Sequence, residues 1–113
     1  NRPFEAIIDM GGTTYSEITL STIVFKYDWI MNPTSFTVLT SEDGKTFTEA
    51  AHMDIECEGR MDDANGCQDY TLRLDETSAR YLKVTAGCYT SLPDWHPGAG
   101  SPGFLFIDEI IVK

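Results

Sequence analysis

The sequence predicts an all-β domain, an antiparallel β-sandwich of the jelly-roll type. Apolar and polar residues alternate with a period of two along short runs that are rich in β-branched and aromatic residues, which is the pattern of half-buried strands. Gly, Asp, Asn and Pro residues interrupt these runs at short intervals, and helical periodicity is hard to find. Several short strands separated by turns favour a sandwich or jelly roll.

Seven segments fit the strand pattern. The clearest turn between them is Asp43-Gly44, which predicts a hairpin between the third and fourth segments. The expected strands are residues 4–9, 17–25, 35–41, 46–51, 69–74, 79–86 and 104–113. The alternating apolar residues that should face the core are Phe36, Val38, Tyr70, Leu72, Leu82, Val84, Leu105 and Ile107.

Length and charge limit the organisation of the chain and its partners. Residues 1–113 suffice for a single domain, and we expect a fragment of a larger protein because the chain lacks an initial Met and reaches an apolar strand almost at once. No run of about 18 apolar residues is present, so no membrane-spanning helix is expected. The net charge of −10 opposes binding to nucleic acid and to anionic membranes, because both attract Lys and Arg.

The three cysteines leave two interpretations open. A disulfide between Cys57 and Cys67 would close the polar loop that they flank. Three reduced thiols, with Cys88 buried at the end of a strand, fit the sequence equally well. The sequence has no CxxC motif, so neither a zinc knuckle nor a thioredoxin-type site is expected.

Three loops carry side chains suited to binding a sugar. A sugar has apolar C–H faces and polar edges, so its site needs an aromatic ring and a few fixed hydrogen-bonding groups. Each ring also has a structural interpretation, with Trp95 covering the end of the core and His96 anchoring its loop by hydrogen bonds. The candidate carbohydrate-binding residues are Trp29 and Asn32 in the first loop, Arg60 and Asn65 in the second, and Asp94, Trp95 and His96 in the third.

Neither a catalytic site nor a metal site is expected. A glycosidase needs two carboxylates across a cleft, whereas Asp108 and Glu109 are neighbours on one expected strand and should point to opposite faces. The acidic residues between Asp54 and Gln68 lack the ligand spacing of a calcium loop, so a solvated loop is the preferred interpretation. No cofactor is expected.

Four stretches, in their order along the chain, resemble the coagulation factor 5/8 type C domain, which is also called the discoidin or galactose-binding-like domain. They are "FEAIIDMGG", "SFTVLTSEDGKTFTEAA", "ARYLKVTA" and "FLFIDEIIV", and together they cover most of the sequence. The combination of "LPDWHPGAG" with "FLFIDEIIV" looks more narrowly like the C-terminal module of bacterial family 20 glycoside hydrolases, the β-N-acetylhexosaminidases or chitobiases.

This resemblance implies a galactose-binding-like jelly roll that lacks the first strand segment of the family. That segment often holds a structural calcium ion, so calcium is expected only there. The resemblance also implies a non-catalytic carbohydrate-binding accessory module of a bacterial periplasmic, cell-surface or secreted β-N-acetylhexosaminidase. Its partners would be a neutral or amino-sugar glycan and a covalently linked catalytic domain.

Two other functions stay open at this point. One is a structural module that packs against the catalytic domain and has no ligand of its own. The other is a lipid- or protein-adhesion domain, which the net charge of −10 disfavours where the lipid is anionic.

Overall fold

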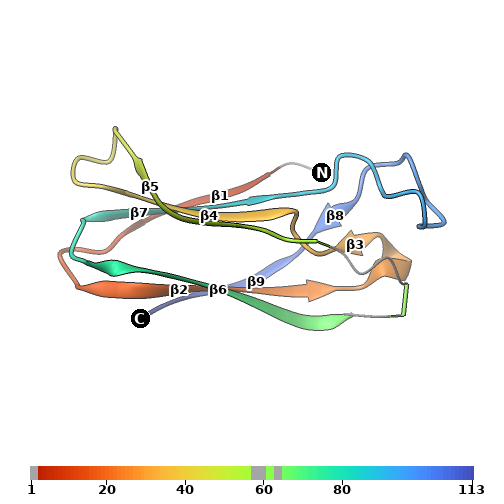
Figure 1. The fold of residues 1–113 in the computed structure, drawn as a ribbon, viewed down its shortest axis with the longest axis horizontal. Helices are drawn as coiled ribbons and strands as arrows, with labels where there is room; N and C mark the ends of the chain where they lie inside the picture. The colour runs from red at the N-terminus through yellow and green to blue at the C-terminus, as the bar shows by residue number, and fades with distance from the viewer. Residues whose placement is uncertain (1–2, 57–60, 63–64) are drawn as a thin grey trace.

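The computed structural model describes residues 3–56, 61–62 and 65–113, and it is a two-layered β-sandwich (Figure 1). One layer is a four-stranded antiparallel sheet with the order β1-β7-β4-β5, and the other is a three-stranded antiparallel sheet with the order β6-β2-β9. A two-residue parallel pair, β3 with β8, lies at one end. The strands are β1 Phe4–Asp9, β2 Tyr15–Val24, β3 Ile30–Met31, β4 Ser35–Ser41, β5 Thr48–Asp54, β6 Gly66–Thr77, β7 Tyr81–Gly87, β8 Phe104–Leu105 and β9 Ile107–Val112.

The predicted fold class is confirmed. The described residues contain no α-helix and only one short 3₁₀ helix, η1 (Lys26–Asp28). The predicted hairpin is formed by β4 and β5 around Asp43-Gly44. Strand β5 begins at Thr48 rather than at residue 46, because the Thr46 N–H donates to Asp43 Oδ1 inside the turn instead of to a neighbouring strand.

Period-two alternation places the core between the two sheets. Strands β4 and β7 pair Phe36 with Ala86 and Val38 with Val84, so the apolar members of both strands point into the same layer. Five of the eight predicted core residues are buried, and Tyr70, Leu105 and Ile107 are half-buried against the core. The buried core consists of Tyr15, Ile18, Leu20, Phe36, Val38, Leu72, Leu82, Val84 and Ala86.

The C-terminal segment departs from the prediction. It forms two strands, β8 and β9, separated by Phe106. A bulge interrupts the pairing of β9 with β2 between Ser21 and Thr22. Asp108 and Glu109 are both exposed, so neither carboxylate lies in the core between the sheets.

The two ends of the sandwich are built differently (Figure 1). Tight connections between β1 and β2, β4 and β5, and β6 and β7 close one end. The other end gathers η1, β3, β8 and the long loop between β7 and β8, and the candidate site residues that the structure describes, which are all but Arg60, lie in or next to these segments. We call it the tryptophan end, and we call the opposite one the turn end.

Candidate carbohydrate-binding site

Trp29 is held at the tip of a small backbone hairpin. The Phe25 and Ile30 backbones exchange two hydrogen bonds, of 2.9 and 3.0 Å, and the Trp29 N–H donates to the Lys26 carbonyl at 3.0 Å. This turn gives Trp29 a φ of 65°, so that it is the only described residue other than glycine with a positive φ. A left-handed backbone costs a residue with a Cβ about 1–2 kcal/mol, and such strain is typical of functional sites.

His96 joins the third loop to the first. Its ring is 3% exposed, and Nε2 lies 2.7 Å from the buried Lys26 carbonyl oxygen. The Gly98 N–H donates to Nδ1 at 2.9 Å, so Nδ1 is the acceptor and Nε2–H is the donor. Both ring nitrogens are therefore bonded to backbone. Of the two interpretations proposed from the sequence, a ligand contact or a loop anchor, His96 fits the loop anchor.

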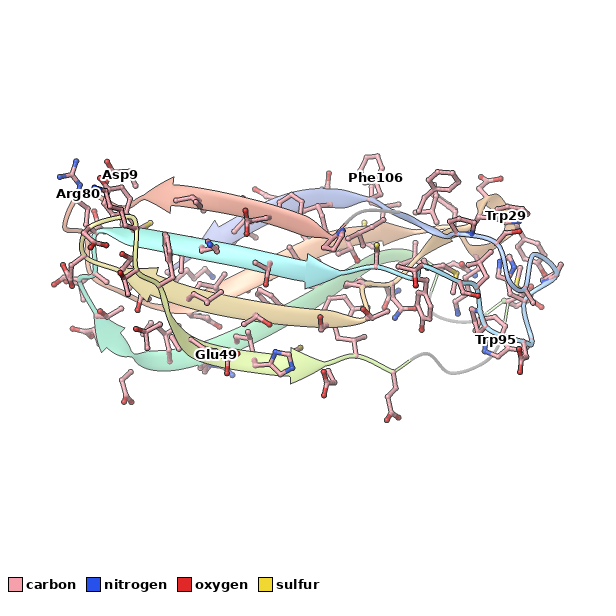
Figure 2. All side chains as sticks on the ribbon, turned by 90° about the horizontal axis from the view of Figure 1, so that it is seen from above. Asp9, Trp29, Glu49, Arg80, Trp95 and Phe106 are labelled. Atoms are coloured by element: carbon pink, nitrogen blue, oxygen red, sulfur yellow. The ribbon has the colours of Figure 1, made fainter. Side chains whose placement is uncertain are left out.

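The two tryptophans flank this buried imidazole. The Trp29 ring stands edge-on to His96 at a centroid distance of 6.3 Å, and the Trp95 ring lies tilted at 6.0 Å. Trp29 is 37% exposed and Trp95 is half-buried, and Figure 2 shows both at the same end of the molecule. Gly98 permits this arrangement, because a Cβ at that position would come within 2.8 Å of the Trp29 ring.

The second loop is tied to the first by two side chains. Asn65 Oδ1 accepts the Lys26 N–H at 3.0 Å, and its Nδ2 donates to the Met61 carbonyl at 2.7 Å. Tyr27 Oη donates to Asp62 Oδ1 at 2.6 Å on the surface. This hydrogen bond to the Asp62 carboxylate, more than burial, raises the pKa of Tyr27 above its ordinary value.

The candidate residues thus divide into exposed rings and buried supports. Trp29, Trp95, His96 and Asn65 are brought together through contacts with one another or with Lys26. Asn32 is 7% exposed and donates to the Pro33 carbonyl, so its burial keeps it from a ligand at the surface. Asp94 is exposed, whereas Arg60 lies outside the described residues.

Lys26 and Tyr27 were not predicted as part of this site. Lys26 is 1% exposed, and its ammonium lies 5.8 Å from the centroid of the Trp95 ring, within the range of a cation–π contact. Tyr27 is 65% exposed and adds a third aromatic ring to this end. The alternation of Phe25, Tyr27 and Trp29 was the available sequence signal for a row of aromatic side chains in the first loop.

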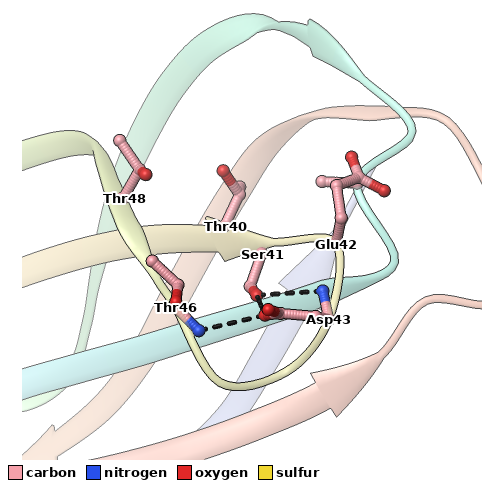
Figure 3. Close-up of a pocket in the computed structure, with 7 residues that line it drawn as sticks. Thr40, Ser41, Glu42, Asp43, Thr46 and Thr48 are labelled. Carbon is pink, nitrogen blue, oxygen red and sulfur yellow. Dashed lines mark hydrogen bonds between the residues drawn. The ribbon is translucent and has the colours of Figure 1, made fainter.

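A hollow also lies at the turn end, and two of the polar residues that line it, Ser41 and Asp43, are bonded within their own turn (Figure 3). It measures about 320 Å³ and is lined by residues of the β4–β5 turn and by Ala79. Asp43 Oδ1 accepts hydrogen bonds from the Ser41 hydroxyl and from the N–H groups of Lys45 and Thr46. These bonds, those to backbone above all, hold the pKa of Asp43 below its ordinary value. The hollow is therefore bordered by a turn whose shape is fixed by the hydrogen bonds of Asp43.

Three further observations bear on site chemistry. No cluster of three or more His, Cys, Asp or Glu side chains that could hold a metal ion occurs within residues 3–56, 61–62 and 65–113. In the same residues, the structure has no helix with the length and apolarity needed to cross a membrane. Cys67 and Cys88 are free thiols, and Cys57, the proposed partner of Cys67, lies outside the described residues.

Comparisons by sequence find no matching family model and no matching curated protein. Comparison by structure finds CpGH89CBM32-5 from Clostridium perfringens, solved in complex with GalNAc-beta-1,3-galactose, at a TM-score of 0.58 and 19% identity, covering 98% of this chain and 66% of that one. The C-terminal domain of a chitobiase from Bacteroides fragilis matches with a TM-score of 0.55 and 19% identity, covering 100% and 64%.

A third structure has the same architecture. CBM32-3 from a family 31 glycoside hydrolase of Clostridium perfringens matches with a TM-score of 0.52 and 17% identity, covering 99% of this chain and 68% of that one. The chain has the galactose-binding-like fold. It spans about two thirds of the length of these three structures, and the predicted resemblance is confirmed at the level of the fold.

Proposed function

We propose that this domain is a non-catalytic carbohydrate-binding module that keeps an attached glycoside hydrolase near its glycan. The observation that carries the proposal is the pair of partly exposed tryptophans, Trp29 and Trp95, held on either side of the buried His96. Rings that are fixed before binding lose little conformational entropy when a sugar stacks on them. The polar groups beside them, Asp94 and the Tyr27–Asp62 pair, can bond to hydroxyl groups at the edge of a sugar.

Structural neighbours support the class of ligand and the kind of parent protein. Two of them are named as carbohydrate-binding modules, one of these in complex with a disaccharide, and the third is a domain of a chitobiase. Together with the sequence resemblance, they lead us to infer a bacterial β-N-acetylhexosaminidase as the parent, secreted, on the cell surface or in the periplasm. The ligand would be a neutral or amino-sugar glycan, and no cofactor is needed for this role.

The test is a glycan array on the purified domain, followed by calorimetric titration of each sugar that binds. Trp95→Ala should abolish binding and change the free energy of unfolding by no more than about 1 kcal/mol, as for a surface residue. A matched control is Phe47→Ala, because Phe47 is also half-buried and has the Lys83 ammonium 4.3 Å from its ring centroid. Phe47 lies in the β4–β5 turn, so its variant should keep full binding.

Two results would contradict the proposal. One is a stability loss of about 3–5 kcal/mol in Trp95→Ala, the cost of deleting a buried aromatic side chain, with no glycan bound on any array. The other is hydrolysis of a nitrophenyl N-acetylglucosaminide by the isolated domain, because the module is proposed to bind without catalysis.

A further inference from the structure

Exposed aromatic side chains continue from Trp29 along one side of the molecule. The described residues have six large apolar side chains that are clearly exposed, and five of them lie in the short segments 25–29 and 104–106. The five are Phe25, Tyr27, Trp29, Phe104 and Phe106, and the sixth, Ile7, belongs to β1. Figure 2 shows Phe106 and Trp29 along the same long side of the sandwich. Exposed apolar side chains gathered in this way indicate a surface that contacts another molecule.

This surface contains a hollow of about 240 Å³ directly beside Trp29. Its walls are Asp28, Ile30, Phe104, Leu105 and Phe106. Backbone pairing fixes them, because β3 and β8 place Ile30 opposite Phe104 and the Phe104 N–H donates to the Trp29 carbonyl at 2.8 Å. The hollow therefore has a defined position relative to Trp29 and does not depend on loop movement.

The lining has the chemistry of a sugar subsite. Phe104 and Phe106, which are 56% and 48% exposed, offer apolar ring surface for a C–H face. The Asp28 side chain is exposed, and its carboxylate makes no hydrogen bond or ion pair within the described part of the chain, so it is available to accept from hydroxyl groups. The hollow is smaller than the usual site of a drug-sized ligand, which suits one ring of a longer glycan.

We propose that this hollow is a second saccharide subsite, and that one glycan runs from the Trp95 side of the tryptophan end across Trp29 into it. The inference rests on the proposed function and adds to it that the ligand is an oligosaccharide of at least two rings. The ligand is not acidic, because the Asp28 carboxylate and a net charge of −10 repel uronic and sialic acids. The same repulsion argues against a second copy of this chain as the occupant.

The experiment measures affinity as a function of glycan length. The probes are N-acetylglucosamine with its β-1,4-linked dimer and trimer, and galactose with GalNAc-beta-1,3-galactose. In the series that binds, the longest member should bind the unaltered domain about tenfold or more tightly than the single sugar, the ratio expected for one added ring-stacking contact. Phe104→Ala and Phe106→Ala should abolish this dependence on length and keep the affinity for the single sugar, whereas Ile7→Ala, an equally exposed apolar change on β1, should alter neither.

The outcomes separate this inference from the proposed function. Loss of all binding in Trp95→Ala, together with loss of only the length dependence in the phenylalanine variants, supports both. Equal affinity for one, two and three rings, or an unchanged length dependence in Phe104→Ala and Phe106→Ala, overturns the second subsite and leaves the module intact. Absence of binding to every probe and to the glycan array overturns the proposed function and this inference with it.

Discussion

The turn end and the tryptophan end of this sandwich each have two aspartates whose carboxylates are bonded differently. At the turn end, Asp43 accepts three hydrogen bonds within its own hairpin and Asp9 forms a two-pronged ion pair with Arg80. At the tryptophan end, the exposed carboxylates of Asp28 and Asp94 make no such bonds within the described part of the chain. Polar groups that are bonded to their own backbone stabilise the fold, whereas groups left open at the surface are available to a ligand.

Buried and exposed residues at the tryptophan end also have different roles. The buried His96 and Lys26 and the half-buried Asn65 connect the three loops to one another. Tyr27 and Trp29 belong to the loop that these connections hold in place, and their rings remain exposed to solvent. The comparison therefore predicts that substitution of an exposed ring at this end can abolish binding with little loss of stability, and that substitutions at the other end change stability alone.

The largest expected effect is that of His96→Ala. It removes a buried ring, leaves the Gly98 N–H without its acceptor and opens a space between Trp29 and Trp95, so the free energy of unfolding should fall by about 2–4 kcal/mol. Glycan affinity should fall as well, because both tryptophans lose the ring that positions them. Denaturant unfolding and titration at a temperature where the variant is folded give the two values.

Arg80→Ala is the matched variant at the turn end. Its ion pair with Asp9 is exposed, so the stability loss should be smaller than for His96→Ala, and glycan affinity should not change. If Arg80→Ala instead destabilised the domain more than His96→Ala, the interpretation of His96 as a structural anchor would be wrong.

Two left-handed residues, one at each end, provide a second test of the comparison. At the turn end Gly44 has a φ of 77°, and a Cβ there would lie 3.2 Å from the Tyr81 ring. Gly44→Ala should therefore lower the free energy of unfolding by about 1–2 kcal/mol, through backbone strain and this close contact. Glycan titration of the same variant should match the unaltered domain, and a loss of affinity would mean that the two ends are coupled.

At the tryptophan end the corresponding substitution is the reverse one, which replaces a residue at positive φ with glycine. Trp29→Gly relieves the strain of a φ of 65° and loses the contacts of the ring with Gly98 and His96. Because these effects oppose one another, the free energy of unfolding should change by no more than about 1 kcal/mol. Glycan binding should nevertheless be lost. Retained binding would show that Trp29 lies beside the site and not in it.

The sequence predicts the strands well and the tryptophan end less well, and the reason is physical. Strands such as β4, predicted at its observed bounds of Ser35–Ser41, bury one face and therefore carry a period of two over their whole length. Strands β3 and β8 have two residues each, which is too short to show any period, and their parallel pairing joins segments that are far apart in the sequence. The hollow beside Trp29 depends on this pairing, so no local pattern could have indicated it.

The burial and backbone conformation of individual residues at the tryptophan end could not be predicted for a related reason. Aromatic character and two flanking prolines single out Trp95 and His96, but only the tertiary structure shows that one is half-exposed and the other buried. Burial of Lys26 runs against the ordinary preference of lysine for solvent. Trp29 occupies a backbone position that normally favours glycine, and this too depends on how the first loop closes through Phe25 and Ile30.

The smallest expected effect is a response to acid that originates at the turn end. Hydrogen bonds from Arg80 hold the pKa of Asp9 below the ordinary value of 3.8, and backbone N–H groups do the same for Asp43. A carboxylate with a lowered pKa in the folded state is protonated more readily in the unfolded state. Its stabilising contribution is therefore complete above about pH 5 and is lost as the pH falls through 3.8 and below. Both groups are exposed, so the contribution of each should be modest.

Melting temperatures of the variants and of the unaltered domain, recorded from pH 7 to pH 2, test this response. Protonation of the other carboxylates affects all of these proteins almost equally, so the difference between the curves reports on the substituted residue. Asp9→Asn and Asp43→Asn should each flatten the acid part of the curve. Added salt separates their causes, since it screens the exposed ion pair of Asp9 with Arg80 and leaves the short hydrogen bonds of Asp43 to Lys45 and Thr46 largely unaffected. In 0.5 M salt, a concentration at which the screening length is only about 4 Å, the effect of Asp9→Asn should shrink while that of Asp43→Asn persists. If neither substitution alters the curve, the hydrogen bonds of the turn end do not contribute to stability as the comparison of the two ends requires.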